Sequence, residues 1–148
     1  MEFKVIEPYD ERGQSPATQR YNHARALMDA GHTDDAIAVF LQSAAALPHS
    51  KTYELIGECH ARLRRFTDAI PFLAAATTLN RGVRAPSLLA EAWFALGRHY
   101  EAIEAADIAL ARDPRNKKAL KVRADAAAEM ERTGAQNDGG SPQNDDAS

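Results

Sequence analysis

The segment AWFALGRHYEAI at residues 92–103 decides the fold, because its second half recurs twice earlier in the chain. The stretches 30–37 (AGHTDDAI), 63–70 (LRRFTDAI) and 96–103 (LGRHYEAI) align without gaps, each 33 residues after the one before. An acid-Ala-Ile triplet closes all three copies. A fixed interval of this length is the sequence signature of a repeat array, in which each unit packs on its neighbours.

Each copy predicts two helices joined by a tight turn. Gly31 and Gly97 can adopt the left-handed conformation that ends a helix, whereas Arg64 takes this place in the middle copy and would carry strain there. Pro48 and Pro114 stop the second helix of their units. Small residues that let two helices approach closely recur at Ala36, Ala69 and Ala102.

The pattern predicts seven helices and no significant sheet. We expect them near 16–30, 33–46, 51–63, 67–80, 86–96, 99–112 and 115–132. Ser15 is the expected cap of the first helix with Pro16 at its first position, and Pro86 should delay the fifth helix to about itself.

The two ends of the chain are expected to differ from the middle. Residues 1–15 are predicted to be a flexible segment, with Phe3-Lys4-Val5-Ile6 too short to form a sheet. The last helix should cap the array, because an array needs a final element with one polar side. Its apolar positions are Ala119, Val122, Ala126 and Met130. Residues 133–148 contain no large apolar side chain and are predicted to be a disordered acidic tail.

Over roughly residues 17–132 this pattern resembles the tetratricopeptide repeat family. The strongest match is 92–103 followed by ALARDP at 109–114. The first repeat keeps Ala24, Leu27, Gly31, Ala36, Phe40 and Pro48, and the second keeps Leu55, Gly57, Ala69, Ile70 and Leu79. Two features depart from the family: its repeat typically has about 34 residues, and Arg81 stands where the middle repeat should have proline.

The resemblance implies an all-α fold: three hairpins in a right-handed superhelix, plus a C-terminal capping helix. The repeats would span about 17–49, 50–82 and 83–115, with the cap at 115–132, so residues 16–132 form one domain. The first helix of each hairpin would line a concave groove.

That groove is where the resemblance places a partner-binding site. The expected lining residues are Tyr21, Asn22, Arg25, Met28, Glu54, Leu55, Glu58, Arg62, Arg84, Ser87, Leu88 and Glu91. Their mixed character suits a peptide with both apolar and charged anchors. A different reading has Leu55 and Leu88 buried between first helices, since an error of one residue in register would turn them inward.

The resemblance implies an adaptor or scaffold that binds a protein or peptide of a kind the sequence does not specify. Two alternatives stay open: a small chaperone for one client, and a non-catalytic subunit of a larger complex. One subclass of the family grips the terminal carboxylate of chaperone tails with lysines and asparagines. Those residues are mostly missing here, so that function is not carried over.

Composition excludes several other classes of function. The chain has 148 residues and a net charge of −3, so it has no global attraction for nucleic acid or anionic lipid. No apolar run approaches the roughly 20 residues that span a bilayer, and the N-terminus lacks a secretory pattern. We therefore expect a cytoplasmic protein, with an oligomeric state that the sequence leaves open.

No arrangement of residues predicts catalysis, a metal or a cofactor. None of the five histidines has a second one three or four residues away on a helix. Cys59 and His60 are adjacent, and adjacent helical residues do not face each other. The basic stretch 112–123 is interpreted as a solvated cap face, with an acidic peptide ahead of nucleic acid as the functional alternative.

Overall fold

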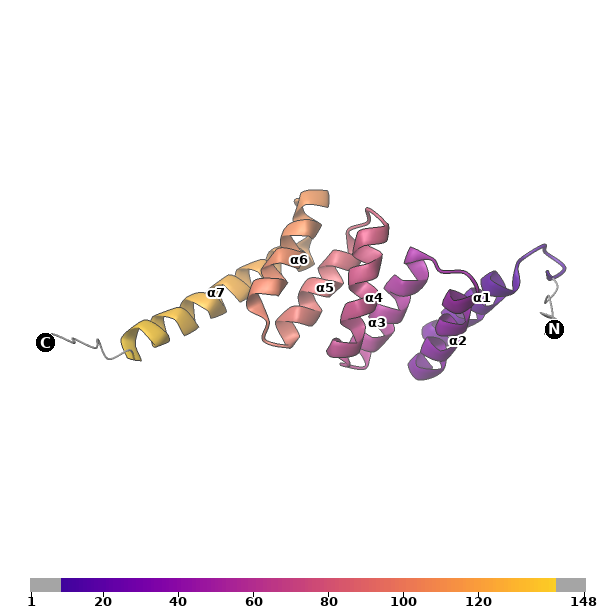
Figure 1. Cartoon of the computed structure of the whole chain (residues 1–148), viewed down its shortest axis with the longest axis horizontal. Helices are drawn as coiled ribbons and strands as arrows, with labels where there is room; N and C mark the ends of the chain where they lie inside the picture. The colour runs from indigo at the N-terminus through magenta and orange to yellow at the C-terminus, as the bar shows by residue number, and fades with distance from the viewer. Residues whose placement is uncertain (1–8, 141–148) are drawn as a thin grey trace, which may run out of the picture.

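The computed structural model describes residues 9–140, and the side chains of residues 9–134. The described part contains seven α-helices and no strand. Their bounds are α1 Pro16–Asp29, α2 Thr33–Ala46, α3 Ser50–Arg62, α4 Phe66–Leu79, α5 Arg84–Ala95, α6 His99–Arg112 and α7 Lys117–Gly140. Successive pairs form three hairpins that stack side by side, and α7 follows the third and projects beyond it (Figure 1). The predicted all-α superhelical fold with a last single helix is confirmed.

The ends of the first six helices follow the predicted signals closely. The Ser15 hydroxyl accepts a hydrogen bond from the Thr18 N–H at 3.2 Å, and Pro16 opens α1. The fifth helix begins at Arg84, before the predicted Pro86. Pro86 is tolerated because its missing N–H falls in the first turn, where a helix has no internal partner for that group.

Turns between the paired helices use the left-handed conformation in all three hairpins. The φ angles are 85° at Gly31 and 74° at Gly97, and Arg64 adopts 58° at the corresponding place. This conformation disfavours a residue with a Cβ by about 1–2 kcal/mol. The Arg64 guanidinium lies 5.2 Å from the centre of the Phe66 ring, an attraction that offsets part of this cost.

The core is built largely from alanines at helix crossings. Ala36, Ala69 and Ala102 are all fully buried, as predicted. Gly57 serves the same purpose in α3: a Cβ built there would lie 2.5 Å from Leu73 Cγ of α4. Because Leu73 is itself fully buried, α3 and α4 can pack at this distance only while position 57 has no side chain.

Arg112 ties the second and third hairpins together. It donates hydrogen bonds to the carbonyl oxygens of Thr77, Asn80 and Gly82, at 2.9, 3.1 and 2.8 Å. These carbonyls lie at the end of α4 and in its connection to α5. The middle repeat, which has Arg81 in place of proline, therefore gains a cap from the hairpin that follows.

The last helix covers the third hairpin with fewer residues than predicted. Ala119, Val122 and Ala126 are buried, but Met130 is 41% exposed. The helix also continues past 132, which corrects the prediction of disorder from residue 133 as far as Gly140. At this point the Thr133 hydroxyl donates back to the carbonyls of Glu129 and Met130, a bond that lets threonine sit in a helix. Residues 1–8 and 141–148, where a flexible segment and a disordered tail are expected, lie outside the described residues.

Candidate functional site

The first helices of the hairpins, together with α7, form a groove with two adjoining hollows. The first groove hollow has a volume of about 250 Å³ and lies among α1, α3 and α5. The second has a volume of about 480 Å³ and lies among α3, α5 and α7. Glu58 and Arg62 border both, so the groove is continuous along the array.

Two buried carboxylates form the floor between α3 and α5. The side chains of Glu54 and Glu58 are only 6% and 9% exposed. Arg84 of α5 bridges them, with its Nε 3.5 Å from Glu54 Oε1 and its Nη2 hydrogen-bonded to Glu58 Oε1. Lys51 pairs with Glu54 and Arg62 with Glu58, each at 3.2 Å. The groove floor is thus a charge network that joins two hairpins.

The network follows the repeat. Glu58, Glu91 and Asp125 occur at intervals of 33 and 34 residues and form an acid series. A cation series with the same spacing contains Lys51, Arg84 and Lys118. Each cation pairs with the acid of the preceding hairpin: Arg84 with Glu58, and Lys118 with Glu91 at 3.1 Å.

The first hairpin breaks this series. Arg25 lies 33 residues before Glu58 and occupies the place of the acid. Lys51 therefore meets a second cation where Arg84 and Lys118 meet carboxylates. Arg25 and Lys51 both line the first groove hollow, together with Arg62 and Arg84. A hydrogen bond from Arg25 to the Tyr21 hydroxyl, at 3.5 Å, raises the pKa of the guanidinium, which stays charged.

The second groove hollow is more apolar. Phe66, Leu88, Phe94 and Val122 contribute its hydrophobic lining. The acids Glu91 and Asp125 border it, each paired with a lysine of α7: Lys118 at 3.1 Å and Lys121 at 2.6 Å. One groove therefore offers a cationic end and an apolar, charge-rimmed end.

The predicted groove residues are only partly brought together. Six of them line the first groove hollow: Arg25, Met28, Leu55, Glu58, Arg62 and Arg84. Tyr21 lines a different cavity, between the first and second hairpins. Asn22 turns away to donate to the Gln14 side chain at 3.2 Å, and the Ser87 hydroxyl is used within its own helix on the Arg84 carbonyl.

Leu55 and Leu88 are packed between helices. They are 4% and 7% exposed, which matches the alternative reading in which both are core residues. Leu55 belongs to the cluster of buried residues from α1, α2 and α3, and Leu88 to the cluster built from α4 to α7. The expectation of two exposed leucine anchors was wrong, because the pattern defined each helix but not its rotation by one residue.

The sequence prediction omitted several lining residues. They are Asp29, Lys51, Phe66, Phe94, Lys118, Lys121, Val122 and Asp125. For the two lysines at 51 and 118 the signal was present, since they lie in register with Arg84.

The basic stretch 112–123 is largely occupied by internal contacts. Arg112 caps α4, and Lys118 and Lys121 pair with acids along the groove. Arg123 pairs with Asp107 at 2.6 Å. These contacts favour the interpretation of a solvated cap face.

Cys59 and His60 point into different environments. Cys59 is fully buried, and desolvation raises the pKa of its thiol to about 11. The His60 ring stacks on Phe72 with 5.8 Å between centres, and burial lowers the pKa of His60. Among the described residues, no three His, Cys, Asp or Glu side chains cluster in a way that could hold a metal ion.

The raised pKa of Cys59 predicts a loss of stability at alkaline pH. Between about pH 9 and pH 11 the thiol ionises in the unfolded chain but not in the folded one. Ionisation therefore favours unfolding as pH rises, by about 1–3 kcal/mol in total. Denaturant unfolding of the parent and of Cys59→Ala across this range measures the effect. Parallel pH profiles for the two proteins would contradict it, because the tyrosines and lysines titrate in both.

Comparisons with known proteins agree with this architecture. The sequence model of the family described as Tetratricopeptide repeat matches residues 21–85. A search among curated protein sequences found no match. None of the helices in the described part of the chain has the length and apolar character needed to cross a bilayer.

Solved structures with this fold are similar along most of the chain. The first tetratricopeptide domain of Spaghetti (RPAP3), bound to the HSP90 peptide SRMEEVD, has a TM-score of 0.73 at 22% identity, covering 77% of this chain and 92% of that one. The second such domain of human RPAP3, in complex with the HSP70 peptide SGPTIEEVD, has a TM-score of 0.71 at 18% identity and coverages of 75% and 94%. MamA from MSR-1 reaches 0.71 at 23% identity, with coverages of 82% and 71%. The repeats, the stacked hairpins and the family match together identify the chain as a member of the tetratricopeptide repeat family.

Proposed function

We propose that this chain is a protein-interaction module whose groove binds a peptide segment bearing acidic side chains. The observation that carries the proposal is the break in the acid series at Arg25. Elsewhere along the groove each cation of the series faces a carboxylate of the protein itself. At the first hairpin the carboxylate is missing, and a ligand can supply it.

The first groove hollow has the chemistry for such a ligand. Four cations and two acids, Asp29 and Glu58, line it. Arginine presents a planar fork of donors that matches both oxygens of a carboxylate. The Arg84 and Arg62 guanidinium groups already contact Glu58, whereas Arg25 contacts only the neutral Tyr21 hydroxyl among its hydrogen-bond partners. Arg25 is therefore the cation best placed to receive an incoming acid.

The second groove hollow extends the site toward α7. Its aromatic and aliphatic lining suits one apolar side chain of the same segment. A segment with an acidic residue at the first hollow and an apolar residue at the second would use both ends of the groove. The solved domains of the Spaghetti protein and of human RPAP3 were determined with peptides that contain two adjacent glutamates, which supports an acidic class of ligand.

Charge reversal at Arg25 is the predicted way to abolish binding. We expect Arg25→Glu to weaken binding of acidic peptides at least about tenfold, because charge pairs at such sites are commonly worth 1.5 kcal/mol or more. The fold should keep its stability within about 0.5 kcal/mol. The new carboxylate would stand opposite Lys51, as Glu58 stands opposite Arg84.

Fluorescence anisotropy with paired peptides, identical except for Glu or Gln, measures this effect. The matched control is Arg115→Glu, which makes the same charge change in the basic stretch, outside both groove hollows. Equal affinities for the Glu and Gln peptides, or a loss of binding in Arg115→Glu alone, would overturn the proposed site.

A further inference from the structure

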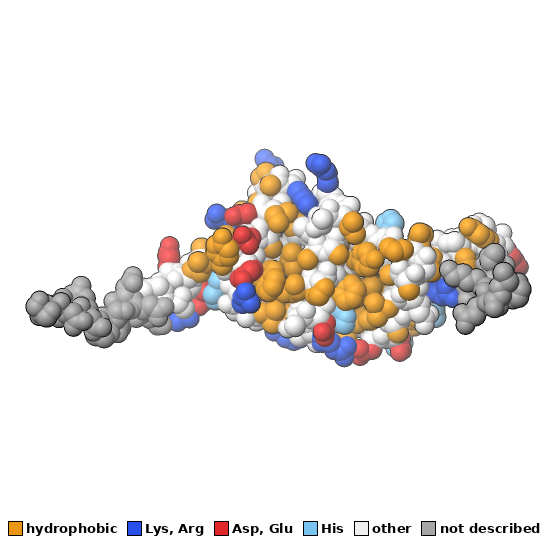
Figure 2. All heavy atoms as spheres, viewed as in Figure 1, with side chains coloured by type: hydrophobic (Ala, Val, Ile, Leu, Met, Phe, Trp, Pro, Cys, Tyr) orange, Lys and Arg blue, Asp and Glu red, His pale blue; other side chains and the backbone are white. Residues whose placement is uncertain are grey.

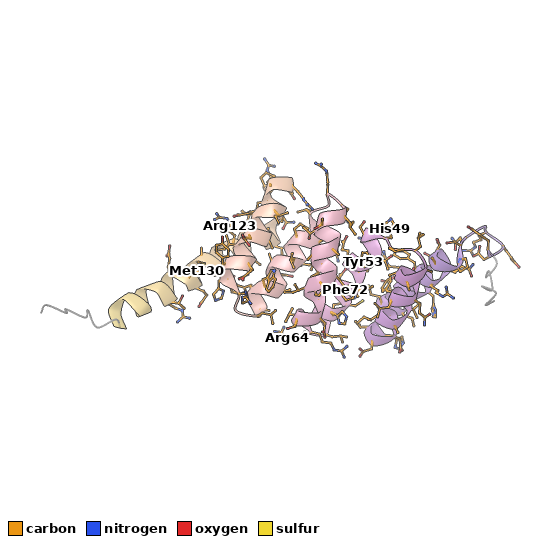
Figure 3. The ribbon with its side chains drawn as sticks, viewed as in Figure 1. His49, Tyr53, Arg64, Phe72, Arg123 and Met130 are labelled. Atoms are coloured by element: carbon orange, nitrogen blue, oxygen red, sulfur yellow. The ribbon has the colours of Figure 1, made fainter. Side chains whose placement is uncertain are left out.

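A third hollow lies between the first and second hairpins, away from the groove floor. This junction hollow has a volume of about 280 Å³ and is lined by Ala17, Tyr21, Leu47, His49, Lys51 and Thr52, among others. Leu47, at its edge, is 55% exposed. His49 lies where the two hairpins meet, in the stretch before α3 (Figure 3). The face of the molecule seen in Figure 2 carries a broad area of hydrophobic side chains over its middle.

The equivalent junction further along the array is closed by a polar clamp. There Arg112 binds the carbonyls of Asn80 and Gly82 in the connection after α4. The residue 33 positions before Arg112 is Leu79, which is 60% exposed and has no polar group with which to clamp the connection at Leu47 and His49. The first junction is therefore apolar where the second is capped.

We propose that the N-terminal segment Phe3-Lys4-Val5-Ile6 of the same chain docks in the junction hollow. Outside the described residues, only this end of the chain has large apolar side chains. Residues 141–148 (SPQNDDAS) offer none, whereas Phe3, Val5 and Ile6 lie within four positions of one another.

The start of the described chain directs this segment toward the hollow. The Asp10 N–H donates to the Gln14 carbonyl at 3.0 Å, and that of Gly13 donates to the Asp10 carbonyl at 2.9 Å. This turn reverses the chain just before α1, and the Gln19 side chain holds it there through the Gln14 carbonyl at 3.0 Å. The chain that enters the turn at Tyr9 consequently comes from the direction of α1.

Reach and charge also fit. The six residues from Phe3 to Tyr9 span up to about 20 Å when extended, and the hollow begins at the first turn of α1. The acids Glu2 and Glu7 flank the apolar residues, and His49 and Lys51 stand at the hollow. Because Lys51 also lines the first groove hollow, a docked segment would hold the first hairpin in place beside the peptide site.

Disulfide trapping in the full chain tests the docking. Lys4→Cys combined with His49→Cys should form an intramolecular crosslink under mild oxidation. The matched control combines Lys4→Cys with Asn22→Cys. Asn22 contacts Gln14 of the same turn but does not line the hollow. Cys59 stays in place because it is buried.

We expect the 4–49 pair to crosslink several-fold faster than the 4–22 pair, and Phe3→Ser with Ile6→Ser added to the 4–49 pair to remove the difference. Equal rates for the two pairs, or a 4–49 rate unaffected by Phe3→Ser and Ile6→Ser, would overturn the proposal. A crosslink that joins two chains and fades on dilution would also overturn it, because the occupant would then be a second copy.

Discussion

Gly57→Ala is expected to lower the free energy of unfolding by about 1–3 kcal/mol, the usual cost of an overpacked core. The added Cβ would lie 2.5 and 2.6 Å from Leu73 Cγ and Cδ2, and 3.3 Å from the Leu73 backbone nitrogen. Leu73 is fully buried and cannot move aside without shifting α4. The loss has to exceed the gain of about 0.5–1 kcal/mol that alanine normally brings to a helix in place of glycine.

Gly134→Ala is the matched control for this substitution. Gly134 also lies in a helix, but no atom would meet its new Cβ within 4 Å. Chemical denaturation should therefore show opposite signs: lower stability for Gly57→Ala, and equal or higher stability for Gly134→Ala. A Gly57→Ala protein as stable as the parent would mean that α3 and α4 are not in such close contact.

Removing α7 is expected to have the largest effect on the fold. A chain that ends at Asn116 loses Ala119, Val122 and Ala126, all buried against the third hairpin. At about 25 cal/mol for each Å² of apolar surface, uncovering both sides of this contact should cost about 3 kcal/mol or more. The exposed alanine-rich face of α5 and α6 should also cause aggregation.

A chain that ends at Gly134 is the control for this truncation. It keeps the three buried residues of α7 and should melt like the full chain. Circular dichroism melting and light scattering distinguish the two truncations. If the chain that ends at Asn116 were as soluble and as stable as the parent, α7 would not be a cap.

The sequence predicted the fold well because repetition defines units that local signals then separate. Gly31, Gly97 and Pro48 mark turns through backbone conformations that few other residues tolerate, and the 33-residue interval places the other helices by analogy. Two helix ends were missed. Pro86 does not prevent a helix from starting at Arg84, and the end of α7 depends on weak preferences in an exposed helix.

The groove was harder to predict, because its character depends on contacts between hairpins. The rotation of α3 and α5 decides whether Leu55 and Leu88 face a ligand or the core, and one residue of register changes the answer. Which cations stay available depends on ion pairs such as Arg84 with Glu58, between residues far apart in the sequence. The acid series and its break at Arg25 were nevertheless visible in the aligned repeats.

Mapping an acidic peptide by NMR on the ¹⁵N-labelled chain tests the peptide-binding groove most directly. The account predicts chemical-shift changes along α1, α3 and α5 around Arg25, Lys51 and Arg84, which disappear for the peptide with Gln in place of Glu. Shift changes confined to residues 115–123 or to the outer helices α2, α4 and α6, or equal changes with both peptides, would contradict it.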